Sequence, residues 1–301
     1  MRFLKLCEDS KPLFFLGIVL AFIVPGASEF FKPALVPILI IMMTFSIKNV
    51  GFSHVEKGNI KTIVKLILIN YVFLTGIYLL AAFFFIHDPL YQKAIIILGL
   101  MPPAIGIISL SYLLKADTKV GFVAEFLGYV AGIAIVPLIT WFIMGDAVNP
   151  AHMLNVLFYV IVIPFLASRI IHHIESKTKS LPLSLTKIVI NFCYALSFYI
   201  IIGLSRDVFL HKLELLIPIA IVLICLKFGV GTLLYVFFKN RIKKKIEVLY
   251  VLFGTFKNGG AAAAILLLLF GVESTVPLAV NAILVPLYIV YLEWLVLSAY
   301  K

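Results

Sequence analysis

Charged side chains are scarce in this sequence. Only 13% of its 301 residues are Asp, Glu, Lys or Arg, whereas 63% are hydrophobic and the mean hydropathy is +1.16. A water-soluble protein needs more polar surface than this composition supplies. The scarcity of charge therefore excludes a water-soluble protein and indicates a chain surrounded by lipid. The longest polar loop, about residues 172–185, is too short to bury a core of its own, so we expect no soluble domain.

Cysteine and histidine are scarce as well. The three cysteines, Cys7, Cys193 and Cys225, have neither paired nor metal-ligand spacing, so the sequence predicts no disulfide, no metal site and no cofactor. The six histidines fall in predicted loops or near the ends of apolar segments, and they form no cluster with Asp, Ser or Cys. Catalysis would need such a cluster on facing helices, so we do not expect an enzyme.

Long apolar segments make up most of the chain. Each has roughly 18 to 27 residues, which is enough to cross ~30 Å of hydrocarbon as a helix. Strands of a membrane barrel would alternate apolar and polar residues, and none of these segments does so. The sequence therefore predicts an all-α membrane protein with ten transmembrane helices. Their approximate limits are 12–28, 33–50, 60–86, 92–114, 118–144, 151–171, 186–204, 213–238, 246–270 and 274–298.

Acidic residues are fewer than basic ones, 14 against 25, which gives a net charge of +11. Most of the basic residues fall at the two termini and in the loops after even-numbered spans. The other loops carry only Lys32, Lys93, Arg206 and Lys212. Lysine and arginine are retained on the cytoplasmic side, so we expect a cell-membrane protein with both termini in the cytoplasm. This asymmetry accounts for the positive charge, and we expect no nucleic-acid partner.

The ten predicted spans divide into two halves of five, residues 1–145 and 146–301. An odd number of spans per half reverses the second half across the bilayer, which gives the inverted repeat common among secondary transporters. In this alignment the fourth span corresponds to the ninth.

Both of these spans are interrupted near the middle. The fourth contains Pro102-Pro103, which removes two backbone donors. The ninth contains Lys257-Asn258-Gly259-Gly260, whose glycines permit unwinding. A single break would indicate only a kink, but breaks at corresponding positions predict a binding site for an ion or a substrate.

At these two segments the sequence resembles the bile acid:sodium symporter family, in a larger group that includes arsenite and auxin-type efflux carriers. The likeness covers nearly the whole chain. It includes Lys11-Pro12, Met42-Met43-Thr44-Phe45, Tyr112-Leu113-Leu114-Lys115 and Lys257-Asn258-Gly259-Gly260-Ala261. The resemblance implies a core domain of spans 3–5 and 8–10 around crossed helices 4 and 9, and a panel of spans 1, 2, 6 and 7 that moves against it. It also implies transport of an organic anion, usually driven by sodium.

The sequence departs from that family where sodium would bind. Hydroxyl, amide and carboxylate oxygens are expected there, but the aligned residues are Ile107 and Ile108 in span 4, Gly121 and Glu125 in span 5, and Phe253 and Lys257 in span 9. Asn258 is the one matching amide. We therefore do not expect conventional sodium coupling.

Three charged residues lie deep in predicted spans: Glu125, Lys227 and Lys257. Each costs ~2.5 to 3.5 kcal/mol at a helix centre and needs a partner or water. Lys227 and Lys257 share a depth of roughly 18 Å at ~1.5 Å per residue, which is too deep for snorkelling. Our hypothesis is that the Lys257 ammonium replaces sodium, paired with Glu125 and with carbonyls freed by the breaks. Lys227 has two readings, an anion contact or a tether to backbone carbonyls, and the tether is slightly favoured.

The sequence thus favours a secondary transporter of a small organic anion, either coupled to protons or uncoupled. We expect this transporter to be a monomer. An efflux carrier of the auxin type and a membrane sensor that binds without transport remain open. A channel would need a continuous polar lining, which spans such as 261–270 lack. Arsenite efflux is disfavoured because no cysteine lies near the break in span 4.

Overall fold

The computed structural model describes residues 8, 10–48, 59–145, 148–178 and 180–298. Cys7 lies outside the described residues. So does Asp146, the residue at which the second half was predicted to begin. Every regular element within the described ranges is a helix. In the first half these are α2 (Ser10–Ile23), α3 (Gly26–Phe31), η1 (Lys32–Ala34), α4 (Leu35–Ile47), α5 (Ile60–Leu68), η3 (Ile69–Leu74), α6 (Thr75–Phe85), α7 (Pro89–Leu100), α8 (Ile107–Leu113) and α9 (Thr118–Met144).

The second half has a similar series of elements. It consists of α10 (Pro150–Lys177), α11 (Leu183–Leu204), α12 (Arg206–His211), α13 (Leu213–Ile224), η5 (Cys225–Gly229), α14 (Val230–Phe238), α15 (Lys244–Phe253), α16 (Gly259–Phe270), η6 (Val272–Thr275) and α17 (Val276–Leu297). The short elements η3 and η5 are π-helical turns within otherwise continuous helices.

Seven helical segments in the described residues are long and apolar enough to cross a membrane, as in a multi-pass membrane protein. They are Gly26–Ile47, Ile60–Phe85, Thr118–Met144, Pro150–Lys177, Leu183–Leu204, Leu213–Phe238 and Val272–Leu297. The other three predicted spans contain shorter apolar helices, Ser10–Ile23, Pro89–Leu100 and Gly259–Phe270. Two of these are short because the fourth and ninth predicted spans are interrupted.

Side-chain caps begin several of the helices. Asp88 accepts from the backbone amides of Leu90 and Tyr91, and Asn149 accepts from that of Ala151. In both cases the next residue is proline, which suits the first helical position because its missing donor would have no partner there. Such caps satisfy amides that apolar surroundings would leave without a partner.

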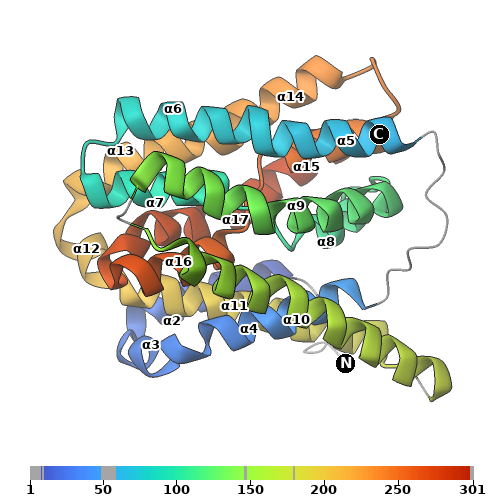
Figure 1. Ribbon diagram of the computed structural model, residues 1–301, viewed down its shortest axis with the longest axis horizontal. Coiled ribbons are helices and arrows are strands. Elements are labelled where there is room, and N and C mark those ends of the chain that lie inside the picture. The colour runs from blue at the N-terminus through green and yellow to red at the C-terminus, as the bar shows by residue number, and fades with distance from the viewer. Residues whose placement is uncertain (1–7, 9, 49–58, 146–147, 179, 299–301) are drawn as a thin grey trace.

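Four helices form a layer on one side of the molecule, which we call the four-helix layer: α2, α4, α10 and α11. Helix α11 packs against α2 and α4, and α10 packs against α4. Figure 1 shows this layer along the lower side of the view, with α5, α6, α13 and α14 along the upper side and α7, α9 and α17 between. The layer meets the other helices through contacts of α4, α10 and α11 with α16, α9 and α17.

Glycine allows the closest helix contact inside this layer. A Cβ atom on Gly17 of α2 would lie 2.5 Å from the carbonyl oxygen of Ala195 on α11. Backbone atoms cannot move aside as the tip of a side chain can, so any larger residue must push the two helices apart.

We expect the substitution Gly17→Ala to lower the free energy of unfolding by about 1 to 3 kcal/mol, because it overpacks the α2–α11 contact. Thermal unfolding of the purified protein in detergent measures this loss. Gly76→Ala is the matched control, since a Cβ there meets nothing within 4 Å and alanine is the better helix former. Equal melting temperatures for the two variants would contradict the close contact.

Candidate functional site

The two interrupted helices meet at their breaks. Helix α7 ends at Leu100 and α8 begins at Ile107, while α15 ends at Phe253 and α16 begins at Gly259. The backbone amide of Asn258 donates to the carbonyl oxygen of Pro102 at 2.9 Å, and Pro103 and Lys257 form an isolated antiparallel bridge. The residues predicted to break the two spans therefore lie together, paired through their backbones.

Asn70 binds the backbone that the second break leaves free. Its side-chain amide donates to the carbonyl oxygens of Phe253, at 2.8 Å, and Phe256, at 3.2 Å. Asn70 is fully buried and lies in the π-helical turn η3, a kind of irregularity frequently found at functional sites. One side chain thus satisfies two carbonyls, one at the end of α15 and one within the break.

The Lys257 ammonium is enclosed by three oxygen atoms. It donates to the Asn70 carbonyl and to Asn70 Oδ1, both at 2.9 Å, and to Thr75 Oγ1 at 3.0 Å. The Thr75 hydroxyl can accept because its own proton goes to the Gly99 carbonyl at 2.7 Å. A lysine has three donors, so these acceptors satisfy all of them. The ammonium also lies 5.0 Å from the centre of the Tyr71 ring, where cation–π attraction adds to its stabilisation.

The expected pair of Glu125 and Lys257 is therefore not formed. No ion pair joins them in the described part of the chain, and Glu125 receives a hydrogen bond from the Tyr129 hydroxyl at 3.3 Å. The other carboxyl oxygen of Glu125 has no partner among the described residues, although the side chain is only 1% exposed. The hypothesis failed because Lys257 is already saturated by neutral oxygens from η3 and α6.

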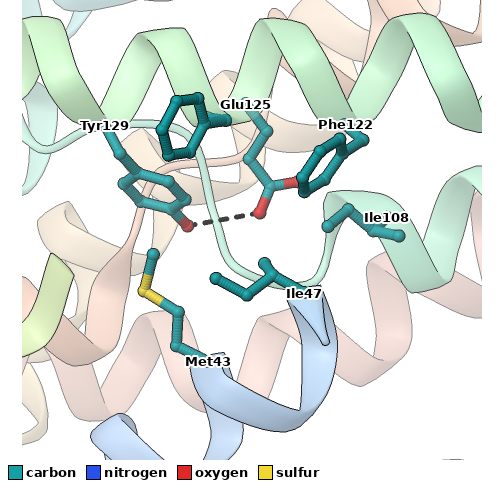
Figure 2. Close-up of a pocket in the computed structure, with 7 residues that line it drawn as sticks. Met43, Ile47, Ile108, Phe122, Glu125 and Tyr129 are labelled. Atoms are coloured by element: carbon teal, nitrogen blue, oxygen red, sulfur yellow. Dashed lines mark hydrogen bonds between the residues drawn. The ribbon is translucent and has the colours of Figure 1, made fainter. Parts of the chain in front are cut away.

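Glu125 instead borders a small cavity between α9 and the four-helix layer. Figure 2 shows Glu125 and Tyr129 of α9 facing Met43 and Ile47 of α4, with Ile108 at the start of α8. Phe122 and Phe126 complete the lining. The cavity holds about 10 Å³, close to the least that admits one water molecule. Ile107, the other isoleucine at the predicted site, is buried next to it.

Lys227 lies beside the second break, in the π-helical turn η5. Its ammonium is 5.2 Å from the ring centre of Phe256 and 5.8 Å from that of Tyr288, and the side chain is 2% exposed. Within the described residues it has no hydrogen-bond or ion-pair partner. The predicted tether to backbone carbonyls is therefore wrong, and two aromatic faces hold this charge instead.

The remaining predicted site residues, Asn258, Gly259 and Gly260, shape the start of α16. Asn258 caps the helix by accepting from the Ala261 amide at 3.0 Å, while its own side-chain amide has no partner in the described ranges. A Cβ on Gly259 would approach Asn281, and one on Gly260 would overlap Leu39 of α4. Glycine at 260 thus lets α16 touch the four-helix layer.

Asn70 and Thr75 are residues of the candidate site that the sequence patterns did not identify. Both lie in the third predicted span, and an isolated amide or hydroxyl there is expected to bond within its own bundle. The missing signal was the π-helical turn, which turns the Asn70 carbonyl and side chain toward the same ammonium. No group of three or more His, Cys, Asp or Glu residues that could hold a metal ion occurs in the part of the chain described.

We expect Thr75→Val to lower the free energy of unfolding by about 1 to 3 kcal/mol, since one donor of a buried ammonium loses its acceptor. Thr140→Val is the matched control, because that buried hydroxyl bonds only within its own helix, to the Val136 carbonyl. Combined with Lys257→Met, Thr75→Val should cost clearly less than it does alone. Additive losses in detergent unfolding would show that the Thr75–Lys257 contact carries no energy.

Comparison with known proteins adds no relative. No protein-family model matches the chain, and no curated protein sequence matches it.

Proposed function

We propose that this protein is a secondary transporter of a small organic anion that works by alternating access. The observation that carries the proposal is the pair of crossed helix breaks, joined by Asn258 and Pro102 and bridged at Pro103 and Lys257. Interrupted helices of this kind form the binding sites of many secondary transporters, because their free backbone groups and helix ends can bind ions and substrates.

A ten-span inverted repeat accounts for the helices best. The broken spans would be α7 with α8 and α15 with α16, the fourth of each half. The spans just before them, α5–η3–α6 and α13–η5–α14, both contain a π-helical turn. Two matching irregularities at matching positions support an inverted five-plus-five arrangement. In that arrangement the basic loops share one side, which we propose is cytoplasmic.

The four-helix layer corresponds to the panel of spans 1, 2, 6 and 7, and the other helices to the core. The cavity between them, at about 10 Å³, is too small for an organic anion. Panel and core must therefore separate to admit one. Two contacts would break on the basic side: the Lys11–Glu293 ion pair at 2.7 Å and the Lys187 ammonium over the Tyr112 ring at 5.4 Å.

The buried charges favour an anionic substrate. Lys257 donates to three neutral oxygens and pairs with no carboxylate among the described residues, so no acidic side chain there offsets its ammonium group. Lys227 has aromatic contacts but no anionic partner in the described residues. Two ammonium groups near the breaks attract negative charge strongly in surroundings of low dielectric.

Coupling to sodium in the family's usual way is not part of the proposal. Ile107 and Ile108 offer no oxygen side chains, and the Lys257 ammonium already occupies a pocket of three oxygens that would suit a cation. Proton coupling and uncoupled efflux are the alternatives within transport. A sensor that binds the anion without moving it is the alternative outside transport.

A thermal-shift screen of detergent-purified protein against small carboxylates and sulfonates tests the proposal. It is run with and without sodium and at two pH values. We expect at least one anion to raise the melting temperature equally with and without sodium, and the same anion to show saturable counterflow in proteoliposomes. Binding without counterflow would favour the sensor, whereas sodium-dependent uptake would show that Lys257 does not replace the cation.

Lys227→Met tests the anion contact. We expect it to weaken binding of the anion found in the screen at least tenfold, about 1.4 kcal/mol, while the melting temperature without ligand is kept. The control is Lys65→Met, which removes an exposed ammonium on α5. Equal affinity in the two variants would assign Lys227 a purely structural role.

A further inference from the structure

We propose that Glu125 binds the coupling proton of this transporter and is protonated whenever the four-helix layer closes against the core. The inference rests on the proposed transport function and names its second substrate. It starts from the position of the carboxyl group at the boundary between the two groups of helices. Met43 and Ile47 approach it from the four-helix layer, and Ile108 and Phe122 from the core.

Burial removes water from Glu125 without supplying a counter-charge. The side chain is 1% exposed, one oxygen accepts from Tyr129, and the other has no partner among the described residues. An isolated carboxylate in such apolar surroundings takes up a proton rather than remain charged. The neutral acid needs only one further acceptor, and the cavity beside it has room for about one water molecule.

In the part of the chain that the structure describes, no cation of the core helices forms an ion pair with Glu125. The Tyr71 hydroxyl donates to the Gly128 carbonyl on α9, and Lys257, over the Tyr71 ring, is bound by Asn70 and Thr75. From α8 come the backbone amide of Ile108, which faces the carboxyl group, and the Ser111 hydroxyl, against Gly121 one turn before Glu125. Lys65 on α5 is exposed.

Among the described residues, no cation of the four-helix layer forms an ion pair with Glu125 either. Tyr194 of α11, beside Gly106, is a titratable group of this layer near the carboxyl. Lys48, which follows α4, is paired with Glu175 at 2.6 Å. Arg169 of α10 donates to the Ile47 carbonyl at 2.7 Å. The neighbouring groups are thus tyrosines or basic side chains already bound to other partners. A proton is therefore what neutralises the Glu125 carboxyl group.

Opening the boundary would reverse this state. When the four-helix layer moves away, Met43 and Ile47 withdraw from the carboxyl group and water can solvate a charged Glu125. The proton then passes from the carboxyl oxygen to water on the open side, and Glu125 must take up a proton from water on that same side before the boundary closes again. Each crossing of the closed state therefore carries one proton.

Infrared spectra of the full-length protein in lipid vesicles test the protonation directly. At neutral pH we expect the carbonyl-stretch band of a protonated carboxylic acid, and we expect Glu125→Gln to remove it. Glu247→Gln is the matched control: that carboxyl is 3% exposed but faces Lys239 and Lys244, so the band should persist. Tyr129→Phe, which removes the hydrogen bond to Glu125, should shift the band to higher frequency. A spectrum unchanged by both Glu125→Gln and Tyr129→Phe would overturn the proposal.

Cross-linking across the boundary tests the link to closure. Tyr112→Cys and Lys187→Cys, introduced after replacement of Cys7, Cys193 and Cys225, report contact between core and layer. We expect the yield of cross-linked protein to fall at least threefold from acid to alkaline pH. With Glu125→Gln we expect this yield to stay high at every pH. The same pH response in both proteins would overturn the proposal. Counterflow distinguishes failure of this proposal from failure of the proposed transport function. A carrier that is active but insensitive to pH would refute only the proton site. A pH-gated protein without counterflow would refute only the transport function.

Discussion

The structure depends on satisfying the backbone groups of two helices that are interrupted in apolar surroundings. No water is available there to replace a missing hydrogen bond, so every freed amide and carbonyl needs a partner from the chain itself. Pro102 supplies a carbonyl to the Asn258 amide, and Asn70 supplies its side-chain amide to one carbonyl at the end of α15 and one within the break. Asn70 then uses its remaining oxygens to hold Lys257. Fold and site therefore share the same few contacts.

The three buried charges are stabilised in different ways, and the differences suit different roles. Lys257 has three oxygen acceptors and is fixed in place. Lys227 rests against aromatic faces, which attract a cation without saturating its donors. Glu125 accepts a hydrogen bond from Tyr129 and borders the cavity between α9 and the four-helix layer. A fixed cation, an unsaturated cation and a carboxyl group at that boundary are what the proposed anion carrier would need.

Sequence patterns predicted the helical segments closely but the partners of the buried charges poorly. Hydropathy located the helical segments. Proline and glycine located both breaks, because they act through local backbone chemistry. The Glu125–Lys257 pair was inferred from the alignment of both residues with the sodium positions of the family and from their depth, and neither gives the direction in which a side chain leaves its helix. The π-helical turn at Ile69–Leu74 sets the direction of the Asn70 side chain, which binds Lys257 instead. An apolar sequence pattern shows neither this turn nor its effect on Asn70.

The two π-helical turns also fix the angular phase of the helices that follow them. A π-helical turn accommodates one residue more than the α-helix would, so the residues beyond η3 are rotated by about 100° relative to an uninterrupted helix. Thr75 begins α6 immediately after that turn, and its hydroxyl faces Lys257 only in the rotated phase. Deleting one residue from Ile69–Leu74 would preserve the hydrophobicity and almost the full length of the span while turning the Thr75 hydroxyl away from the site. Chain length within this span is thus as strict a determinant of the site as the identity of the residues that line it.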